Sequence, residues 1–207
     1  MSELIECQPN LGNFTKSLLS IGYTHYTAIL DIIDNSIASD CTKVWINYEI
    51  SDKKSSIVIS DNGSGMTNQE LFEAMRIASA DPLQTRVSDS DLGKFGLGLK
   101  LASFSQTDKF QVISKNETSE FCSYCWDLNI VRKENRWLIK KESVERFKND
   151  IERKSGTDVI LYKLREFDEN IDIKNKLKLS PINIAKARLR IRIVNSYVSR
   201  ISTTRCY

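Results

Sequence analysis

The chain has 207 residues, of which 41% are hydrophobic and 28% are charged, and its formal net charge is +3. This length supports one well-buried domain plus an extension. No apolar run approaches the roughly 18 to 20 residues that span a bilayer, and the N-terminus lacks the basic-then-apolar order of a signal peptide. We therefore expect a soluble, cytoplasmic protein with no membrane partner.

Basic residues are concentrated at the C-terminal end. Residues 173–207 contain nine Lys or Arg and no acidic residue, whereas the preceding part has 21 basic against 27 acidic residues. We predict a domain over residues 1–170 and a basic extension over 171–207, which is compatible with the start of a truncated following domain. The tail over 173–207 suits contact with nucleic acid or an acidic partner, although a solvated helix face has the same composition.

The chain has five cysteines, an odd number, and their spacing does not match a disulfide framework. This pattern favours a reducing compartment. Cys122 and Cys125 form a C-x-x-C motif within a strand-like run. A structural zinc site would need a second ligand pair, so we assign no metal to this motif.

The first predicted elements are two helices, a short one ending near Gly22 and a second over residues 28–38, with Thr24 or Thr27 as its N-cap. On the second helix Asp31 and Asn35 lie one turn apart and share a face. Four apolar residues point away from that face, namely Ile29, Leu30, Ile33 and Ile37. A carboxylate beside an amide suits a water-activating base next to a Mg²⁺ ligand, and it also suits a plain solvated face.

Strands and helices then follow without regular alternation. We predict a hairpin from strands at 44–50 and 56–61, a helix at 68–78, a long loop at 79–92 and a helix opened by the glycines at 93–98. Strands are predicted at 110–114, 120–128, 136–142 and 157–164, while residues 186–193 suit either a strand or part of a helix. This order predicts an α+β sandwich rather than a doubly wound parallel sheet.

Two glycine-containing motifs suggest ligand binding. Asp61 ends a predicted strand and is followed by Asn-Gly-Ser-Gly, whose glycines permit close approach of a flat ligand, although such a sequence is also a common tight turn. The stretch GKFGLG at 93–98 places backbone N–H groups at a helix start, which favours phosphate. It has neither the preceding strand of a dinucleotide-binding motif nor the G-K-[ST] ending of a P-loop.

Four motifs in this order resemble the GHKL ATPase superfamily, which includes Hsp90-type chaperones, type II topoisomerases, MutL-type repair proteins, MORC-type ATPases and histidine kinases. They are D-x-x-D-N on a helix, D-x-G-x-G-M after a strand, G-x-F-G-x-G-x-K at a helix start, and Gly-Thr before a strand. The resemblance covers about residues 20–165, and GKFGLGLKLAS looks closest to MORC-type and related prokaryotic members. It implies the Bergerat ATP-binding fold, a two-layer α/β sandwich with a mixed sheet, helices on one face and a mobile ATP lid.

The resemblance also implies roles for individual residues. Asn35 would coordinate Mg²⁺ at the ATP phosphates, and Asp61 would accept a hydrogen bond from the adenine amino group, with Thr157 acting beside it through water. Gly63, Gly65 and Met66 would shape the adenine pocket. The phosphates would be enclosed by Gly93, Lys94, Phe95, Gly96, Leu97 and Gly98, with residues 79–92 as the lid.

The position of the general base departs from the common pattern. Asp31 stands where the chaperone and repair branches commonly have Glu, and its shorter side chain predicts slow hydrolysis. Lys94 and Lys100 are candidates for the charge that other branches take from a following domain, and a structural role for Lys100 is equally compatible. We therefore predict Mg-dependent ATP binding, slow ATPase activity and an ATP-dependent homodimer. A non-hydrolysing ATP sensor or scaffold, and histidine-kinase-type phosphotransfer, are the alternatives.

Overall fold

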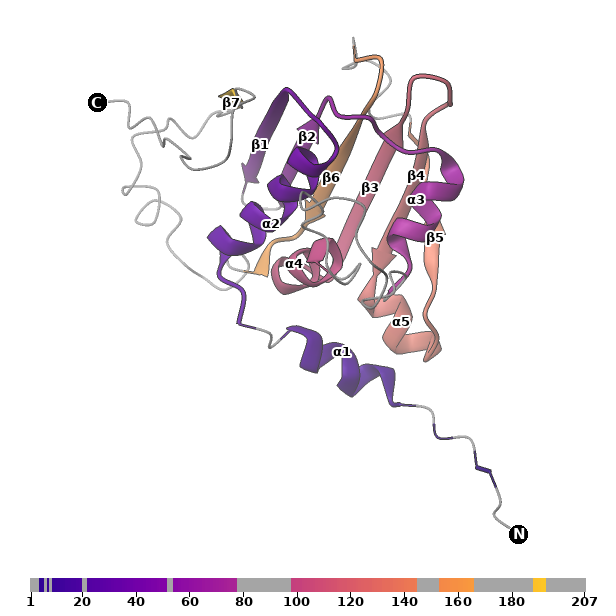
Figure 1. The fold of residues 1–207 in the computed structure, drawn as a ribbon. Helices are drawn as coiled ribbons and strands as arrows, with labels where there is room; N and C mark the ends of the chain where they lie inside the picture. Colours follow the sequence, from indigo (N-terminus) through magenta and orange to yellow (C-terminus); the bar gives the residue numbers. More distant parts are fainter. Residues whose placement is uncertain are drawn as a thin grey trace.

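Seven strands in the described part of the chain form one sheet, with the strand order β5-β4-β3-β6-β2-β1-β7 (Figure 1). The computed structural model describes residues 4–5, 7, 9–19, 22–51, 54–77, 98–144, 153–165 and 188–192. The strands are β1 (Lys43–Ser51), β2 (Lys54–Asp61), β3 (Lys109–Lys115), β4 (Cys122–Asp127), β5 (Ile139–Lys141), β6 (Gly156–Tyr162) and β7 (Arg188–Arg192). Every pair of neighbouring strands is antiparallel, so the expectation of a mixed sheet was wrong.

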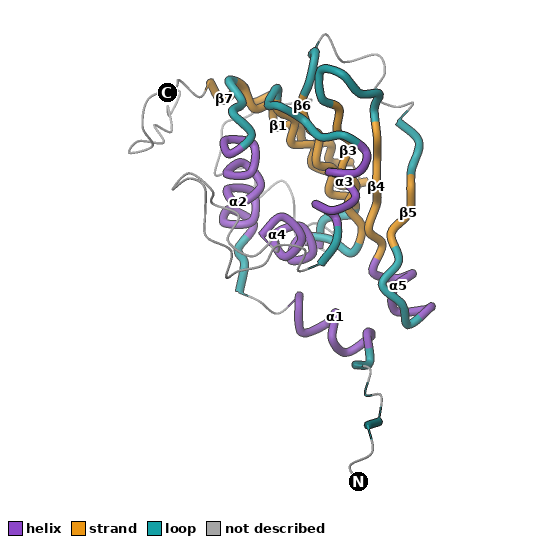
Figure 2. Tube along the Cα trace, turned by 45° about the vertical axis from the view of Figure 1, so that its right-hand side comes forward, coloured by secondary structure: helices purple, strands orange, loops and turns teal. Residues whose placement is uncertain are grey.

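The α+β sandwich is confirmed. The helices are α1 (Leu11–Leu19), α2 (His25–Ala38), α3 (Asn68–Met75), α4 (Gly98–Gln106) and α5 (Leu128–Glu134). Figure 2 shows α2, α3 and α4 lying against one face of the sheet, and the hydrophobic core fills the space between these two layers. None of the helices in the described ranges has the length and apolar character that crossing a membrane requires.

Helix α2 begins at a reciprocal cap. The Thr24 hydroxyl accepts from the backbone N–H of Thr27, and the Thr27 hydroxyl accepts from the backbone N–H of Thr24, so both predicted N-cap candidates take part. The buried side of the helix is formed by Ala28, Ile29, Ile32, Ile33 and Ser36. This side includes a serine, because α2 packs against the end of β2 as well as against α4.

The predicted hairpin is confirmed as β1 and β2, whose register pairs Ser51 with Lys54. Helix α5 was not predicted. It follows β4 directly, with the Asp127 side chain accepting from the Asn129 N–H at its start and Asn135 in the left-handed conformation, with φ of 47°, at its end. Of the stretch at 186–193, residues Arg188–Arg192 form a strand that pairs with β1. The predicted lid at 79–92 lies outside the described residues.

Candidate functional site

Asp61 is a buried carboxylate at the end of β2, with only 4% of its surface exposed. Its Oδ1 accepts from the backbone N–H groups of Gly63 at 2.9 Å and Thr157 at 3.1 Å. Its Oδ2 accepts from the Ser36 hydroxyl at 2.9 Å. The side chain is therefore held by three different parts of the chain: α2, the loop after β2, and the start of β6.

The donors that the described residues supply to Asp61 leave its carboxylate with one further acceptor position. An ionised carboxylate offers about four acceptor positions, and the three donors use three of them. Burial raises the pKa of Asp61, whereas these donors and the nearby Arg153 act in the opposite direction. The arrangement suits recognition of a ligand that donates a hydrogen bond, such as an amino group.

The loop after Asp61 packs closely against its neighbours. A Cβ on Gly63 would overlap the side chain of Ser39, which caps the C-terminus of α2. Gly65 has a φ of 64°, and a Cβ there would overlap the backbone carbonyl of Lys115 at the end of β3. Contacts within the protein therefore already require glycine at both positions predicted to shape the adenine pocket.

Thr157 and Met66 are connected through Ser114 of β3. The Ser114 hydroxyl lies 2.9 Å from the Thr157 hydroxyl, and the Met66 N–H donates to the Ser114 oxygen, also at 2.9 Å. Thr157 pairs directly with Ser114 in the register of β3 and β6. Asp61, Gly63, Met66 and Thr157 thus lie in one hydrogen-bonded group. Ser114, which connects Met66 to Thr157, was not revealed by the sequence.

Asp31 and Asn35 share a face of α2, as predicted. The Asn35 Nδ2 donates to the backbone carbonyl of Asp31 at 2.6 Å, and the Asn35 side chain is exposed. No described residue donates to its Oδ1, so this oxygen is available to a ligand. Asp31 accepts a hydrogen bond from the Tyr23 hydroxyl at 2.6 Å. Burial, followed by the contact with Asp31, raises the pKa of Tyr23 to about 12, so this phenol remains a donor at neutral pH.

The described ranges contain no cluster of three or more His, Cys, Asp or Glu side chains that could hold a metal ion. Of the residues that the structure describes, Asn35 would thus be the one proposed ligand. This fits Mg²⁺, which commonly takes one or two protein oxygens and completes its shell with water and substrate phosphates.

Helix α4 carries the last residue of the predicted phosphate motif. Gly98 begins the helix, and no described atom lies within 4 Å of a Cβ built on it, in contrast to Gly63 and Gly65. The other five motif residues, Gly93, Lys94, Phe95, Gly96 and Leu97, lie outside the described residues. The described residues therefore do not fill the space at the Gly98 Cβ position, which is compatible with the predicted phosphate contact.

Lys100 has a structural contact. Its side chain is buried, and its Nζ donates to the carbonyls of Ala74 at 2.6 Å and Arg76 at 2.8 Å, at the C-terminus of α3. Burial lowers the pKa of Lys100 to about 8, so the ammonium is still charged at neutral pH. Of the two roles compatible with the sequence, the contacts favour the structural one.

Sequence reasoning missed four side chains that support the site: Tyr23, Ser36, Ser114 and Arg153. Three of them bear hydroxyl groups, and nothing in the local pattern marks Tyr23, Ser114 or Arg153. A signal was available for Ser36 alone, because it falls on the apolar side of α2, where a buried hydroxyl needs a partner.

A comparison with protein families matches residues 23–157, more than half of the chain, to the family described as histidine kinase-, DNA gyrase B-, and HSP90-like ATPases. A comparison with curated proteins found no match. The matched range begins at Tyr23, just before α2, and ends at Thr157, so it contains Asp31, Asn35 and Asp61 together with their described partners. The chain belongs to the GHKL family of ATPase domains.

Proposed function

We propose that this domain binds ATP with Mg²⁺ and hydrolyses it slowly, with Asp61 recognising the adenine amino group. The observation that carries the proposal is the buried Asp61 carboxylate, which three donors hold in place while one acceptor position has no partner in the described ranges. An exocyclic amino group can donate to that position, and family membership supports ATP as the ligand that brings it.

The other end of the ligand would lie at α2 and α4. In the proposed arrangement Asn35 offers its side-chain oxygen to Mg²⁺, which neutralises phosphate charge when it is bound. The N-terminus of α4 at Gly98 would face the phosphates, together with residues 93–97. Asp31, held by Tyr23, would accept the proton of the attacking water.

We further propose that ATP closes the lid at residues 79–92 and so creates a surface for homodimerisation, which makes the domain a switch timed by slow hydrolysis. The GKFGLGLKLAS sequence favours a MORC-type or related prokaryotic branch for this behaviour. Sedimentation with a non-hydrolysable ATP analogue is expected to show a dimer, and a monomer at saturating analogue would contradict it. A non-hydrolysing sensor would bind ATP without releasing phosphate.

Isothermal titration calorimetry tests the binding proposal. Asp61→Asn and Asn35→Ala should each weaken Mg-ATP binding about tenfold or more, since a hydrogen bond to a charged group is worth about 1.5–3 kcal/mol. Without Mg²⁺, Asn35→Ala should bind ATP as the wild type does. Asn13→Ala, an exposed change on α1, is the control and should bind normally. Unchanged affinity for Mg-ATP in both site variants would contradict the proposal.

A further inference from the structure

The segment that leads into β6 surrounds the backbone of Asp61. The Arg153 Nη1 donates to the Asp61 backbone carbonyl, and Thr157 donates its N–H to the Asp61 carboxylate at 3.1 Å. Between them lies Gly156, whose φ of 144° and absent side chain allow the chain to pass directly against the Asp61 carbonyl. Main chain and side chain of Asp61 are thus both held by the same short segment.

The same segment also holds the loop that follows Asp61. The Ser155 hydroxyl donates to the carbonyl of Gly63 at 2.7 Å. Together with the Arg153 contact, this places one donor on each side of Asn62. The loop therefore cannot shift relative to β6 without breaking at least one of these contacts.

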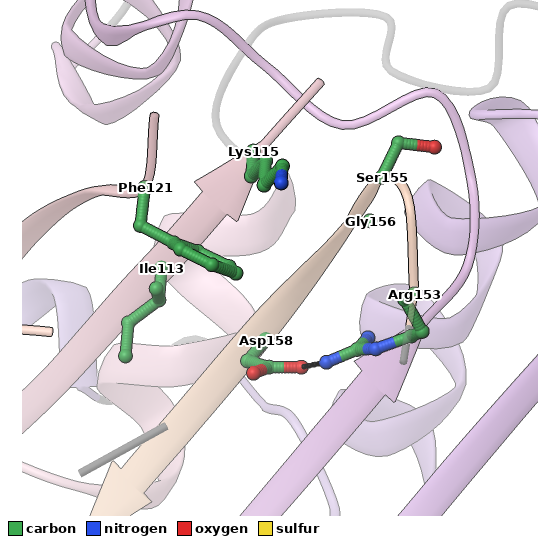
Figure 3. A pocket seen from close by; sticks show the side chains of 7 residues that line it. All are labelled: Ile113, Lys115, Phe121, Arg153, Ser155, Gly156 and Asp158. Atoms are coloured by element: carbon green, nitrogen blue, oxygen red, sulfur yellow. Dashed lines mark hydrogen bonds and ion pairs between the residues drawn. The ribbon is translucent and has the colours of Figure 1, made fainter. Parts of the chain in front are cut away.

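Arg153 is itself held by an ion pair with a buried carboxylate. Its Nη2 donates to the Asp158 carboxylate at 2.6 Å, and the two side chains are only 17% and 4% exposed (Figure 3). Its guanidinium also lies 5.6 Å from the ring centre of Trp45, within the range of a cation–π contact. The planar guanidinium thus joins side chains of β1 and β6 to the backbone at the end of β2.

The contacts of Arg153 lie on the face of the sheet opposite the one that α2 covers, where the base is proposed to bind. Successive residues of a strand point to opposite faces, so Asp158 lies on the face opposite Thr157, away from α2. Ser36 of α2 reaches Asp61 from the helix-covered face, whereas Arg153 reaches it from the face of Asp158. The ion pair with Asp158 uses Nη2, whereas Nη1 donates to the Asp61 carbonyl. An arginine that only stabilised β6 would not need this second contact.

We propose that Arg153 is a positioning residue for base recognition: anchored by Asp158, it fixes the backbone of Asp61 so that the carboxylate meets the amino group of adenine. This inference rests on the proposed function for its ligand, and on the contacts alone for the placement of Asp61. Burial raises the pKa of Asp61, and the positive charge of Arg153 acts with the three hydrogen-bond donors against that rise, which favours the ionised form that accepts a hydrogen bond.

Two measurements on Arg153→Met test this role. The first is amide hydrogen exchange at Gly63 and Thr157, the two backbone donors to Asp61 Oδ1, and needs no nucleotide. Both amides should exchange at least about tenfold faster than in the wild type. The second is the ratio of affinities for ATP and for purine riboside triphosphate, which lacks the 6-amino group. This ratio should fall about tenfold, because the variant weakens the hydrogen bond from the 6-amino group, which only ATP can form.

Arg132→Met is the matched control, because Arg132 also forms a partly buried ion pair, with Asp108, but does not contact Asp61. It should change neither measurement. Arg153→Lys retains the positive charge but lacks the two separate nitrogens that reach Asp61 and Asp158 together. Both measurements for this variant should lie between those of the wild type and Arg153→Met, which keeps the test valid should Arg153→Met fold poorly. Unchanged amide exchange in Arg153→Met, or equal losses of affinity for the two nucleotides, would overturn the proposal. A wild type that bound both nucleotides equally would instead overturn the adenine role of Asp61, while exchange would still decide whether Arg153 holds it.

Discussion

Two glycines of the candidate site differ in what surrounds them. Gly65 has positive φ and abuts the Lys115 carbonyl, so only glycine fits there whether or not a ligand binds. At the start of α4, Gly98 has free space around its Cβ position among the described residues. Contacts with the described residues therefore do not require glycine at this position, and the proposed phosphate contact would account for it.

Alanine substitutions separate the two reasons. Gly98→Ala should leave the free energy of unfolding within about 0.5 kcal/mol of the wild type, or raise it, since alanine favours helix. Its affinity for Mg-ATP should nevertheless fall. Gly65→Ala should instead lower the free energy of unfolding by about 2 kcal/mol or more, because it combines strain with overlap. Urea unfolding and calorimetry check both variants, and a Gly98→Ala protein with normal affinity would remove the proposed phosphate contact.

Asp31 and Tyr23 give a second prediction at this scale. Asp31→Ala should lower the rate of phosphate release about a hundredfold or more while ATP still binds, because general bases contribute about 10²–10⁴-fold. Tyr23→Phe removes only the 2.6 Å hydrogen bond to Asp31, so kcat should fall by a smaller factor with little change in KM. Steady-state phosphate release measures both. Turnover at the wild-type rate in Asp31→Ala would show that another group is the base.

At the scale of elements, Lys100 joins α4 to the end of α3. Its ammonium supplies donors to two carbonyls that a helix C-terminus leaves without partners, and α3 leads directly into residues 78–97, which include the proposed lid. Lys100→Met keeps the length of the side chain but removes the donors. We expect the free energy of unfolding at pH 7 to fall by about 1–3 kcal/mol, the cost of leaving buried acceptors unpaired.

The dependence on pH identifies this contact. Burial lowers the pKa of Lys100 from 10.5 to about 8, so between these values the unfolded chain holds a proton that the folded chain has released. The free energy of unfolding of the wild type should therefore rise with pH across this window, relative to Lys100→Met. Urea unfolding at pH 7.5 and pH 10 measures it, with the exposed Lys140→Met as control. Parallel pH profiles for wild type and Lys100→Met would contradict the lowered pKa.

Elements with a complete local signal could be predicted from the sequence. The β1–β2 hairpin has two β-rich runs around a polar turn, and α2 has caps and a helical period. Helix α5 was missed because its Leu128 and Val131 are too few to establish a period, although Asp127 and Asn135 are suitable caps. Antiparallel pairing throughout the sheet was missed because strand order depends on contacts between distant segments, which no local pattern encodes.

Residues of the candidate site also divide into those with a local sequence signal and those that depend on long-range contacts. Asp61 could be predicted because a carboxylate between a strand and glycines is a recognisable pattern, and Asp31 with Asn35 because helical spacing places them together. Arg153 could not, since its partners Asp158, Trp45 and Asp61 come together only when β6 pairs beside β2 and β1. Long-range packing, rather than local sequence, brings this arginine to the backbone of Asp61.

For the whole molecule, the basic C-terminal region contributes to the sheet. Strand β7 comes from the extension predicted over 171–207, and it pairs antiparallel with β1, with Arg190 opposite Trp45. The boundary near residue 170 stays a prediction. Cutting the chain at 172 would remove a strand that covers the edge of β1, so a loss of function in such a truncation would not report on charge alone.

Substitutions of charge therefore test the predicted contact of the tail with nucleic acid. Lys174, Lys176 and Lys178 precede β7, and changing all three to Gln leaves Arg188–Arg192 intact. If they bind phosphates, the slope of log affinity for duplex DNA against log salt should become shallower by about 0.9 for each phosphate that the tail no longer neutralises. The control changes the exposed Lys16, Lys133 and Lys140 to Gln, which alters net charge equally at positions outside the tail. Equal slopes in the two triple variants, or DNA binding that salt does not weaken, would assign the basic residues of the tail a role other than phosphate contact.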